Sequence, residues 1–168
     1  MDLEGIIKQI GNVSKGEIKR IASEDCTEIK EIIMKSNPKD PYEKMVVGFL
    51  TSLCAEYMYP ETFHLEKDGL DYIGFELEKG NIETGTAGKN LGTCMKGGKI
   101  VVKKAGEETG SGMSGGEIIA EEIKSIGNTI GGRIITEKVD KISKTQGADI
   151  FINGMKFKRG LVERLLRR

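Results

Sequence analysis

The sequence predicts a mainly β protein with some helix: a right-handed parallel β-helix of about five coils, preceded by a small helical region. Glycine accounts for 23 of the 168 residues, about twice its usual share, and most of it lies between Gly69 and Gly160. Within this region a motif recurs every 18 residues, whereas residues 1–60 have helical periodicity. A period of 18 residues is too short for a helical hairpin and suits one coil of a β-solenoid.

The repeat is evident when the segments GFELEKGNIET, GTCMKGGKIVV and GSGMSGGEIIA are aligned without a gap. Four columns then agree: Gly74, Gly92 and Gly110; Leu77, Met95 and Met113; Gly80, Gly98 and Gly116; Ile82, Ile100 and Ile118. Two further copies with a period of 16 add Ile134 and Ile150 to the isoleucine column. Because glycine tolerates positive φ and close backbone approach, we expect these glycines at the corners of a β-helix over residues 61–155.

Alternation along each strand predicts which side chains face the core. The isoleucine column should point inward, together with Thr84, Val102, Ala120, Thr136 and Ile152. The outward column reads Glu83, Val101, Ile119, Ile135 and Phe151. Contiguous apolar surface usually lies under another element or at an interface. We therefore expect the N-terminal helices, the C-terminal helix or a second subunit to pack on the last four of these residues.

Residues 1–60 predict three or four short helices. The segment SEDCTEIKEIIMKSNP offers Ser23 as an N-cap and ends at Asn37-Pro38. The following segment has Asp40 as N-cap and Pro41 at the first helical position, and its faces are mostly apolar, so we expect a buried helix. Short helices are also typical of DNA-binding domains, but acidic residues outnumber basic ones in this region.

The stretch Gly112-Met113-Ser114-Gly115-Gly116 matches the G-x-S-x-G pattern of a serine hydrolase. Catalysis would need a histidine base, and the sole histidine, His64, precedes the serine in the chain. One and two coils earlier, Lys96 and Glu78 occupy the position of Ser114, which is therefore a variable slot. We interpret Ser114 as a turn residue, with nucleophilic catalysis as the alternative.

Metal and phosphate sites also lack a defined pattern. His64 has Glu61, Glu66 and Asp68 nearby in sequence, but at no spacing typical of a metal site, and we interpret it as a surface residue. Backbone N–H groups of the glycine runs could cradle a phosphate, yet no G-K-[ST] follows them and no helix is expected there. We expect neither a cofactor nor a metal.

The tail MKFKRGLVERLLRR combines basic residues with a single acid, Glu163. Its apolar residues, Leu161, Val162, Leu165 and Leu166, predict a basic amphipathic helix over 156–168. Because solenoids need their open ends covered, we expect this helix to cap the last coil. Binding to an acidic partner or to RNA is the alternative.

Charge and cysteine content limit the functional classes further. Lys plus Arg and Asp plus Glu both number 26, so the whole chain has no net field to attract nucleic acid or an anionic membrane. Cys26, Cys54 and Cys94 form no C-x-x-C pair, and a reducing cytoplasm is the simplest compartment. No apolar run approaches the roughly 18 residues of a membrane span, and the start MDLEGII is acidic, unlike a signal peptide. We expect a cytoplasmic protein without membrane or nucleic-acid partners.

The runs GKNLGTCMKGGKIVV and GEETGSGMSGGEIIA resemble the GXGXG repeat domain at the C-terminal end of the large chain of glutamate synthase, and the related repeats found in formylmethanofuran dehydrogenase. The resemblance covers about residues 62–155 and rests on the repeated G-x-x-M-x-G-G-x-I. It implies a parallel β-helix that supports and spaces catalytic domains without housing flavin, iron–sulfur or metal chemistry. The last two coils are shorter than this pattern, and the chain contains neither an amidotransferase domain nor a flavin-binding barrel.

The resemblance favours a non-catalytic scaffold or interaction subunit of a redox or amidotransfer complex, with a protein partner or a homo-oligomer. One alternative is an enzyme, either a hydrolase or a small-molecule-binding enzyme with a site between the helices and the solenoid. The other is a nucleic-acid-binding adaptor that uses the N-terminal helices. Fold resemblance gives only an expectation here, because one scaffold can carry different functions.

Overall fold

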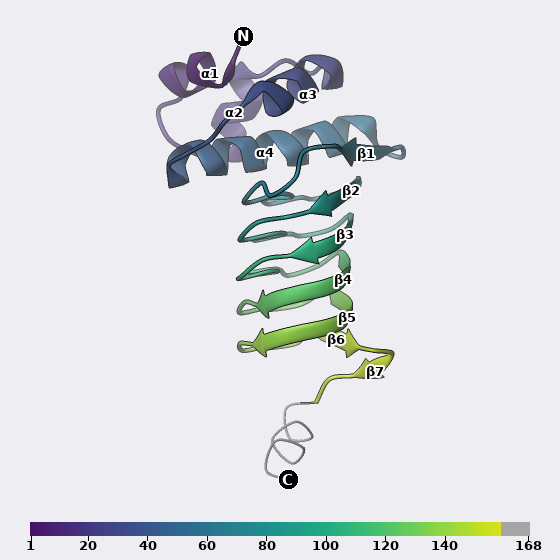
Figure 1. The fold of residues 1–168 in the computed structure, drawn as a ribbon. Helices are drawn as coiled ribbons and strands as arrows, with labels where there is room; N and C mark the ends of the chain where they lie inside the picture. The colour runs from purple at the N-terminus through teal and green to yellow at the C-terminus, as the bar shows by residue number, and fades with distance from the viewer. Residues whose placement is uncertain (159–168) are drawn as a thin grey trace.

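The computed structural model describes residues 1–158, and it confirms the predicted fold class. Four helices lie at one end of a right-handed parallel β-solenoid of about five turns (Figure 1). The N-terminus lies at the helical end, and the chain descends the solenoid one layer at a time (Figure 1). Within the described residues no helix is long and apolar enough to cross a membrane.

The four helices are α1 (Leu3–Gln9), α2 (Lys15–Ile21), α3 (Cys26–Lys35) and α4 (Pro41–Met58). Each begins after a residue whose side chain accepts a hydrogen bond from a backbone N–H of the first turn: Asp2, Ser14, Asp25 and Asp40. The N-cap expected at Ser23 is wrong, because Asp25 accepts from the N–H of Thr27 at 2.8 Å. The Ser23 hydroxyl instead accepts from the N–H of Asp25 at 3.0 Å and so supports the capping residue.

Helix α4 lies between the other helices and the first coil of the solenoid (Figure 1). Residues 46–55 of this helix are buried on every side, as its apolar sequence predicts. Two glycines allow the backbones to approach here. A Cβ added at Gly48 would lie 2.4 Å from the carbonyl oxygen of Tyr72, and one at Gly80 would lie 2.5 Å from that of Ala55. Larger side chains at these two positions would push the helix away from the solenoid.

One sheet runs the length of the solenoid, with its strands in sequence order: β1 (Thr62–Leu65), β2 (Asn81–Thr86), β3 (Lys99–Ala105), β4 (Glu117–Ile126), β5 (Arg133–Ile142), β6 (Asp149–Ile152) and β7 (Met155–Lys156). The pairs from β1 to β6 are parallel, and β7 pairs antiparallel with β6. The core ladder is in register and almost fully buried: Phe63, Ile82, Ile100, Ile118, Ile134 and Ile150. Phe63 extends the ladder one strand beyond the five expected isoleucines.

The corners repeat a backbone conformation as well as a residue type. The two glycine columns of the repeat all have positive φ, between 67° and 101°. The column that contains Gly112 also has positive φ at Cys94 and Glu76, 54° and 52°, although neither residue is glycine. The conformational repeat is therefore more regular than the sequence repeat.

The last coil is closed by a hairpin rather than left open. Asn153 and Gly154, with φ of 50° and 80°, form the two-residue turn between β6 and β7. The N–H of Phe157 then donates to the carbonyl oxygen of Ile150 at 2.7 Å, and Phe157 packs against the core. The helix expected over 156–168 is wrong at its first residue, since Lys156 lies in β7; residues 159–168 lie outside the described part of the chain.

Candidate functional site

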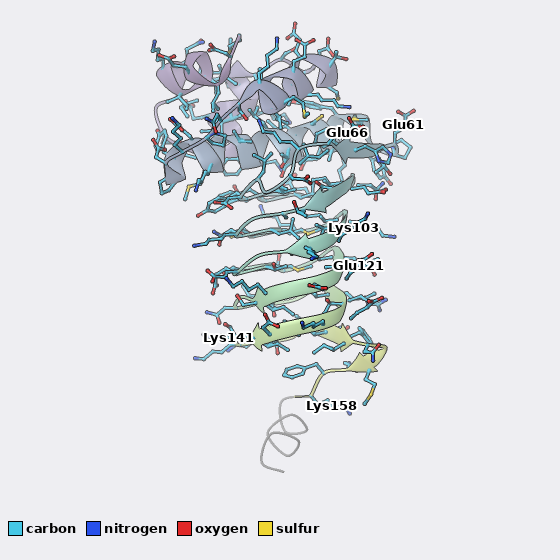
Figure 2. All side chains as sticks on the ribbon, in the orientation of Figure 1. Glu61, Glu66, Lys103, Glu121, Lys141 and Lys158 are labelled. Carbon is cyan, nitrogen blue, oxygen red and sulfur yellow. The ribbon has the colours of Figure 1, made fainter. Side chains whose placement is uncertain are left out.

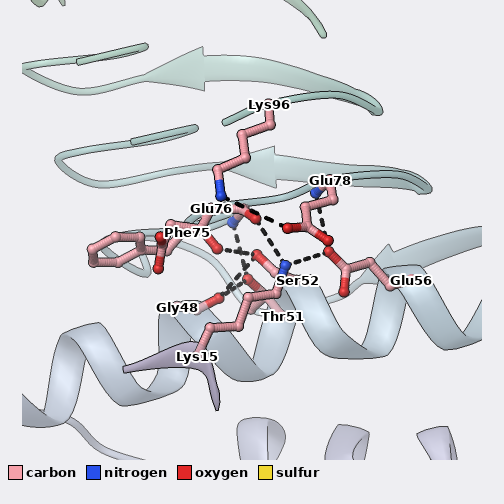
Figure 3. Close-up of polar contacts among 10 residues, drawn as sticks. Lys15, Gly48, Thr51, Ser52, Glu56, Phe75, Glu76, Glu78 and Lys96 are labelled. Carbon is pink, nitrogen blue, oxygen red and sulfur yellow. Dashed lines mark hydrogen bonds and ion pairs between the residues drawn. The ribbon is translucent and has the colours of Figure 1, made fainter. Parts of the chain in front are cut away.

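A polar network ties the helical region to the first turn of the solenoid (Figure 3). The Lys15 ammonium lies 2.5 Å from Glu56 Oε1 of α4 and donates to the carbonyl oxygen of Glu76 at 2.8 Å. The same carboxylate oxygen accepts from the N–H of Glu78 at 3.0 Å. Only 15% and 11% of the Lys15 and Glu56 side chains are exposed, so water competes weakly for these contacts.

Two hydroxyl groups of α4 complete this network beneath the ion pair. Thr51 Oγ1 accepts from the N–H of Gly74 at 3.0 Å and donates to the carbonyl oxygen of Gly48 at 2.6 Å. Ser52 Oγ donates to the carbonyl oxygen of Phe75 at 2.7 Å. Each group satisfies a backbone atom of the first coil, which explains why the hydroxyls are buried without penalty. The network is a structural junction.

The candidate interaction surface lies on the side of the solenoid. It is the outward column of the sheet, and we call Val101, Ile119, Ile135 and Phe151 the apolar stripe. The four residues are neighbours in register across β3, β4, β5 and β6, and each is partly exposed. Glu83, the next residue of the column on β2, is exposed and lies 3.8 Å from His64 Nδ1. The column thus changes from polar to apolar along the rod.

The helices do not cover this stripe. They stack on the end of the rod, where α4 contacts β1 and β2, and Figure 1 shows no helix beside β3–β6 in the described chain. Of the three coverings expected for the stripe, the N-terminal helices are therefore wrong, while the C-terminal segment lies outside the described residues and a second subunit stays a prediction. The helical region covers the end of the core ladder and so shields Phe63 and Ile82 from water. The stripe stays open within residues 1–158.

Charged residues line one edge of the apolar stripe, two positions earlier on each strand. They alternate in sign along the rod: Lys99, Glu117, Arg133 and Asp149. Glu117 lies 3.9 Å from Lys99 and 3.8 Å from Arg133, and Asp149 lies 3.0 Å from Lys156. Partly exposed pairs of this kind contribute little to folding stability. We call these four residues the charged edge.

The Arg133 guanidinium lies 5.6 Å from the centre of the Phe151 ring and so connects the charged edge to the apolar stripe. Along the other edge the strands bend: the register passes from Val102 to Lys104 and from Ala120 to Glu122, with consecutive exposed residues at each bend. Figure 2 shows Lys103 and Glu121 among the charged side chains on this part of the solenoid. The flat face is therefore narrow, with one apolar column and one charged column.

Ser114 is exposed in the corner before β4, where its N–H donates to the carbonyl oxygen of Met95 at 2.9 Å. His64 lies in β1, three strand spacings or about 14 Å away along the rod. The structure does not bring these two residues together. His64 instead faces Glu83, and no group of three or more His, Cys, Asp or Glu side chains in residues 1–158 could hold a metal ion.

The interior of the solenoid is filled by side chains. Leu77, Met95 and Met113 are fully buried, as are the isoleucines opposite. A hollow of about 680 Å³ is an open groove between α1 and α3, lined by Leu3, Ile32 and several carboxylates. It does not lie between the helices and the solenoid, where the enzyme alternative would need a site.

The cysteines are free and lie in two places. Cys26 and Cys54 face each other from α3 and α4, and each thiol donates to the other residue's carbonyl oxygen, at 3.6 and 3.8 Å. Burial raises the pKa of the Cys54 thiol to about 12, so it stays protonated and unreactive at neutral pH. Cys94 is exposed at a corner of the solenoid, where partial burial and the carboxylate of Glu76 raise its pKa.

Comparison with known proteins gives no match: no family model, no curated protein and no solved structure matches the chain.

Two features of the surface had sequence signals that were missed. Asn153-Gly154 between two apolar runs is a strong signal of a β-hairpin, and it places Lys156 beside Phe151 in the outward column. The alternating signs of the charged edge recur with the same 18- and 16-residue spacings as the isoleucines. Both signals become visible only when the strand register is applied to the outward-facing residues as well as to the core ladder.

Proposed function

We propose that this chain is a non-catalytic scaffold or interaction subunit whose apolar stripe docks another protein. One observation carries the proposal: four apolar side chains of consecutive strands lie in register on the outer face, and no described element covers them. Outward positions of a solvated sheet are normally polar. An apolar column on that side is typical of an interface.

The rest of the molecule supports this role. Helices close one end of the rod and a hairpin with Phe157 closes the other, so the sides remain as docking surfaces. Within residues 1–158 the interior of the solenoid is lined by fully buried side chains such as Leu77, Met95 and Met113. By its resemblance to the GXGXG repeat domain, the chain serves a cytoplasmic redox or amidotransfer complex as a spacer between catalytic parts.

Capture from the native cell tests the proposal. The full chain, tagged, is expressed as wild type, as Ile119→Asp, as Ile135→Asp and as Ile130→Asp. Ile130 is 62% exposed at a corner outside the stripe, so it is a matched control for an apolar-to-acid change. We expect a protein to be retained in fixed ratio by the wild type and by Ile130→Asp, and to be lost from both stripe variants.

The captured protein can be a redox or amidotransferase subunit, or an untagged second copy of the chain. Equal retention by all four forms would show that the stripe is not the docking surface. Turnover of an ester by the purified chain, abolished in Ser114→Ala, would replace the scaffold proposal with the hydrolase alternative.

A further inference from the structure

The outward column has a two-fold pattern of charge. From β2 to β7 it reads Glu83, Val101, Ile119, Ile135, Phe151 and Lys156, since Lys156 pairs with Phe151 across the hairpin and faces the same side. An acid stands at one end, a base at the other, and four apolar residues lie between them. If the column is set beside a copy of itself in reverse order, the base of one lies opposite the acid of the other, and apolar residues lie opposite apolar residues.

The charged edge has the same property. From β3 to β6 its signs are positive, negative, positive and negative, at Lys99, Glu117, Arg133 and Asp149. Reversing this order inverts every sign. Both columns are therefore complementary to their own reverse about the same point, midway between β4 and β5.

We propose that the apolar stripe docks on the apolar stripe of a second copy of this chain, with the two rods antiparallel and the two-fold axis between β4 and β5. This inference rests on the proposed function and names the partner. Ile119 meets Ile135 of the second copy, and Val101 meets its Phe151. Glu117 meets Arg133 of the second copy, Lys99 meets its Asp149, and Glu83 meets its Lys156, each pair occurring twice.

The distances suit these contacts. Two sheets that pack face to face lie about 10 Å apart, and strands are spaced about 4.8 Å in both copies. Lysine and arginine side chains can span such a gap to a carboxylate, and each already contacts an acid in its own chain at 3.0 to 3.9 Å. The apolar contacts exclude water at the centre, while the ionic contacts fix the orientation.

The antiparallel arrangement is selected by charge. A parallel two-fold would place the charged edge opposite the bend of the second copy, where Lys103 and Glu121 have the same signs as Lys99 and Glu117. Of the bend residues, Glu137 opposite Arg133 has the opposite sign, so the parallel dimer has more repulsive than attractive pairs. In the antiparallel arrangement the two bends face each other, so that Glu121 lies opposite Glu137 of the second copy; this like-charged pair is outweighed by the three opposite-charged pairs named above. The face is about 24 Å long over six strands, which is short for an obligate dimer. We therefore expect dissociation on dilution.

A mixing experiment with Glu117→Lys and Arg133→Glu tests the proposal on the purified full chain. Each variant alone places like charges opposite each other twice, and we expect each to weaken self-association more than about tenfold. Mixed together, the two variants restore opposite charges at both sites, so a heterodimer should form with about wild-type affinity. The Glu117–Arg133 contact within each chain is not repaired by mixing, so recovery on mixing reports only contacts between chains.

The measurements are light scattering after size exclusion from about 1 µM to about 1 mM, native mass spectrometry of the mixture, and circular dichroism to show that each variant is folded. Lys141→Glu, an exposed change outside the stripe (Figure 2), is the control and should leave the dimer intact. Ile119→Asp should abolish the dimer.

Two results overturn the inference. If the wild type stays monomeric at every concentration, while Ile119→Asp still loses a captured protein in the native cell, the second copy is not the partner and the proposed function stands. If a dimer forms but resists Ile119→Asp, or if the mixed variants do not form a heterodimer, the dimer uses another surface or orientation. If Ile119→Asp loses neither the captured protein nor the dimer, the proposed function is overturned as well.

Discussion

The Lys15 ammonium lies 2.5 Å from Glu56 Oε1 and 2.8 Å from the carbonyl oxygen of Glu76, so one side chain of α2 holds both α4 and the first turn of the solenoid. Removing one member of a largely buried ion pair leaves the other poorly solvated. We predict that Lys15→Met lowers the free energy of unfolding by about 2–3 kcal/mol. Equilibrium unfolding in urea, followed by circular dichroism, measures this change.

Lys8 provides the control for this prediction, because it forms an ion pair with Glu4 at 2.8 Å on the exposed face of α1. Lys8→Met should leave the unfolding midpoint unchanged, since solvent screens such pairs. Equal effects of the two substitutions would show that the junction at Lys15 does not hold the two regions together.

Lys67 caps the C-terminal end of α3 from the loop after β1. Its ammonium donates to the carbonyl oxygens of Ile33, Met34 and Ser36, at a helix end where carbonyl oxygens lack the N–H groups of a following turn. Lys67→Met should cost about 1–2 kcal/mol and should speed amide hydrogen exchange in the last turn of α3. Lys39→Met, at an exposed site nearby, should change neither; faster exchange spread evenly over all helices would contradict a local capping role.

Cys94 has a φ of 54°, a conformation that costs an L-residue about 1–2 kcal/mol and glycine almost nothing. The residue one turn later in the same column is Gly112. We predict that Cys94→Gly raises stability by about 0.5–1 kcal/mol, and that Gly112→Ala lowers it, because a Cβ at Gly112 would lie 3.0 Å from Cys94 Sγ. Thermal unfolding of the two variants tests this, and a lower midpoint for Cys94→Gly would refute it.

Cys54 should make stability depend on alkaline pH. Burial raises the pKa of its thiol from 9.0 to about 12, so between these values the folded chain keeps a proton that the unfolded chain loses. The contribution is complete below pH 9 and is lost as pH rises toward 12. The stability advantage of the wild type over Cys54→Ala should therefore shrink by about 2 kcal/mol between pH 8 and pH 10.5. An advantage that is the same at both pH values would contradict the burial of this thiol.

The solenoid could be predicted because its repeat fixes the register: residues 18 or 16 positions apart lie opposite each other, and Ile82, Ile100 and Ile118 are stacked. The first strand was missed because Phe63 precedes Ile82 by 19 residues and no glycine pair precedes it. The positive φ of Glu76 and Cys94 was missed because these residues do not resemble Gly112. The column pattern of the sequence therefore predicts the register. It does not predict the backbone conformation at a corner, because unlike residues adopt the same conformation there.

The place of the helices could not be predicted from their own pattern. The apolar faces of α4 indicate that it is buried, but they do not distinguish the end of a solenoid from its side. The glycines that decide the matter, Gly48 and Gly80, allow contact only where the close backbone approach occurs. The same limit applies to the apolar stripe. Its sequence pattern predicts that it faces outward but does not decide which element or partner covers it.

Covalent footprinting of the stripe tests the central claim most directly. A carbene label applied in concentrated extract of the native cell should modify Ile119 weakly in the wild type and strongly in Ile135→Asp, because docking shields the stripe and the charge prevents docking. The exposed Ile130 should be labelled equally in both. Equal labelling of Ile119 in the two forms, at the level expected for a partly exposed side chain, would contradict the account.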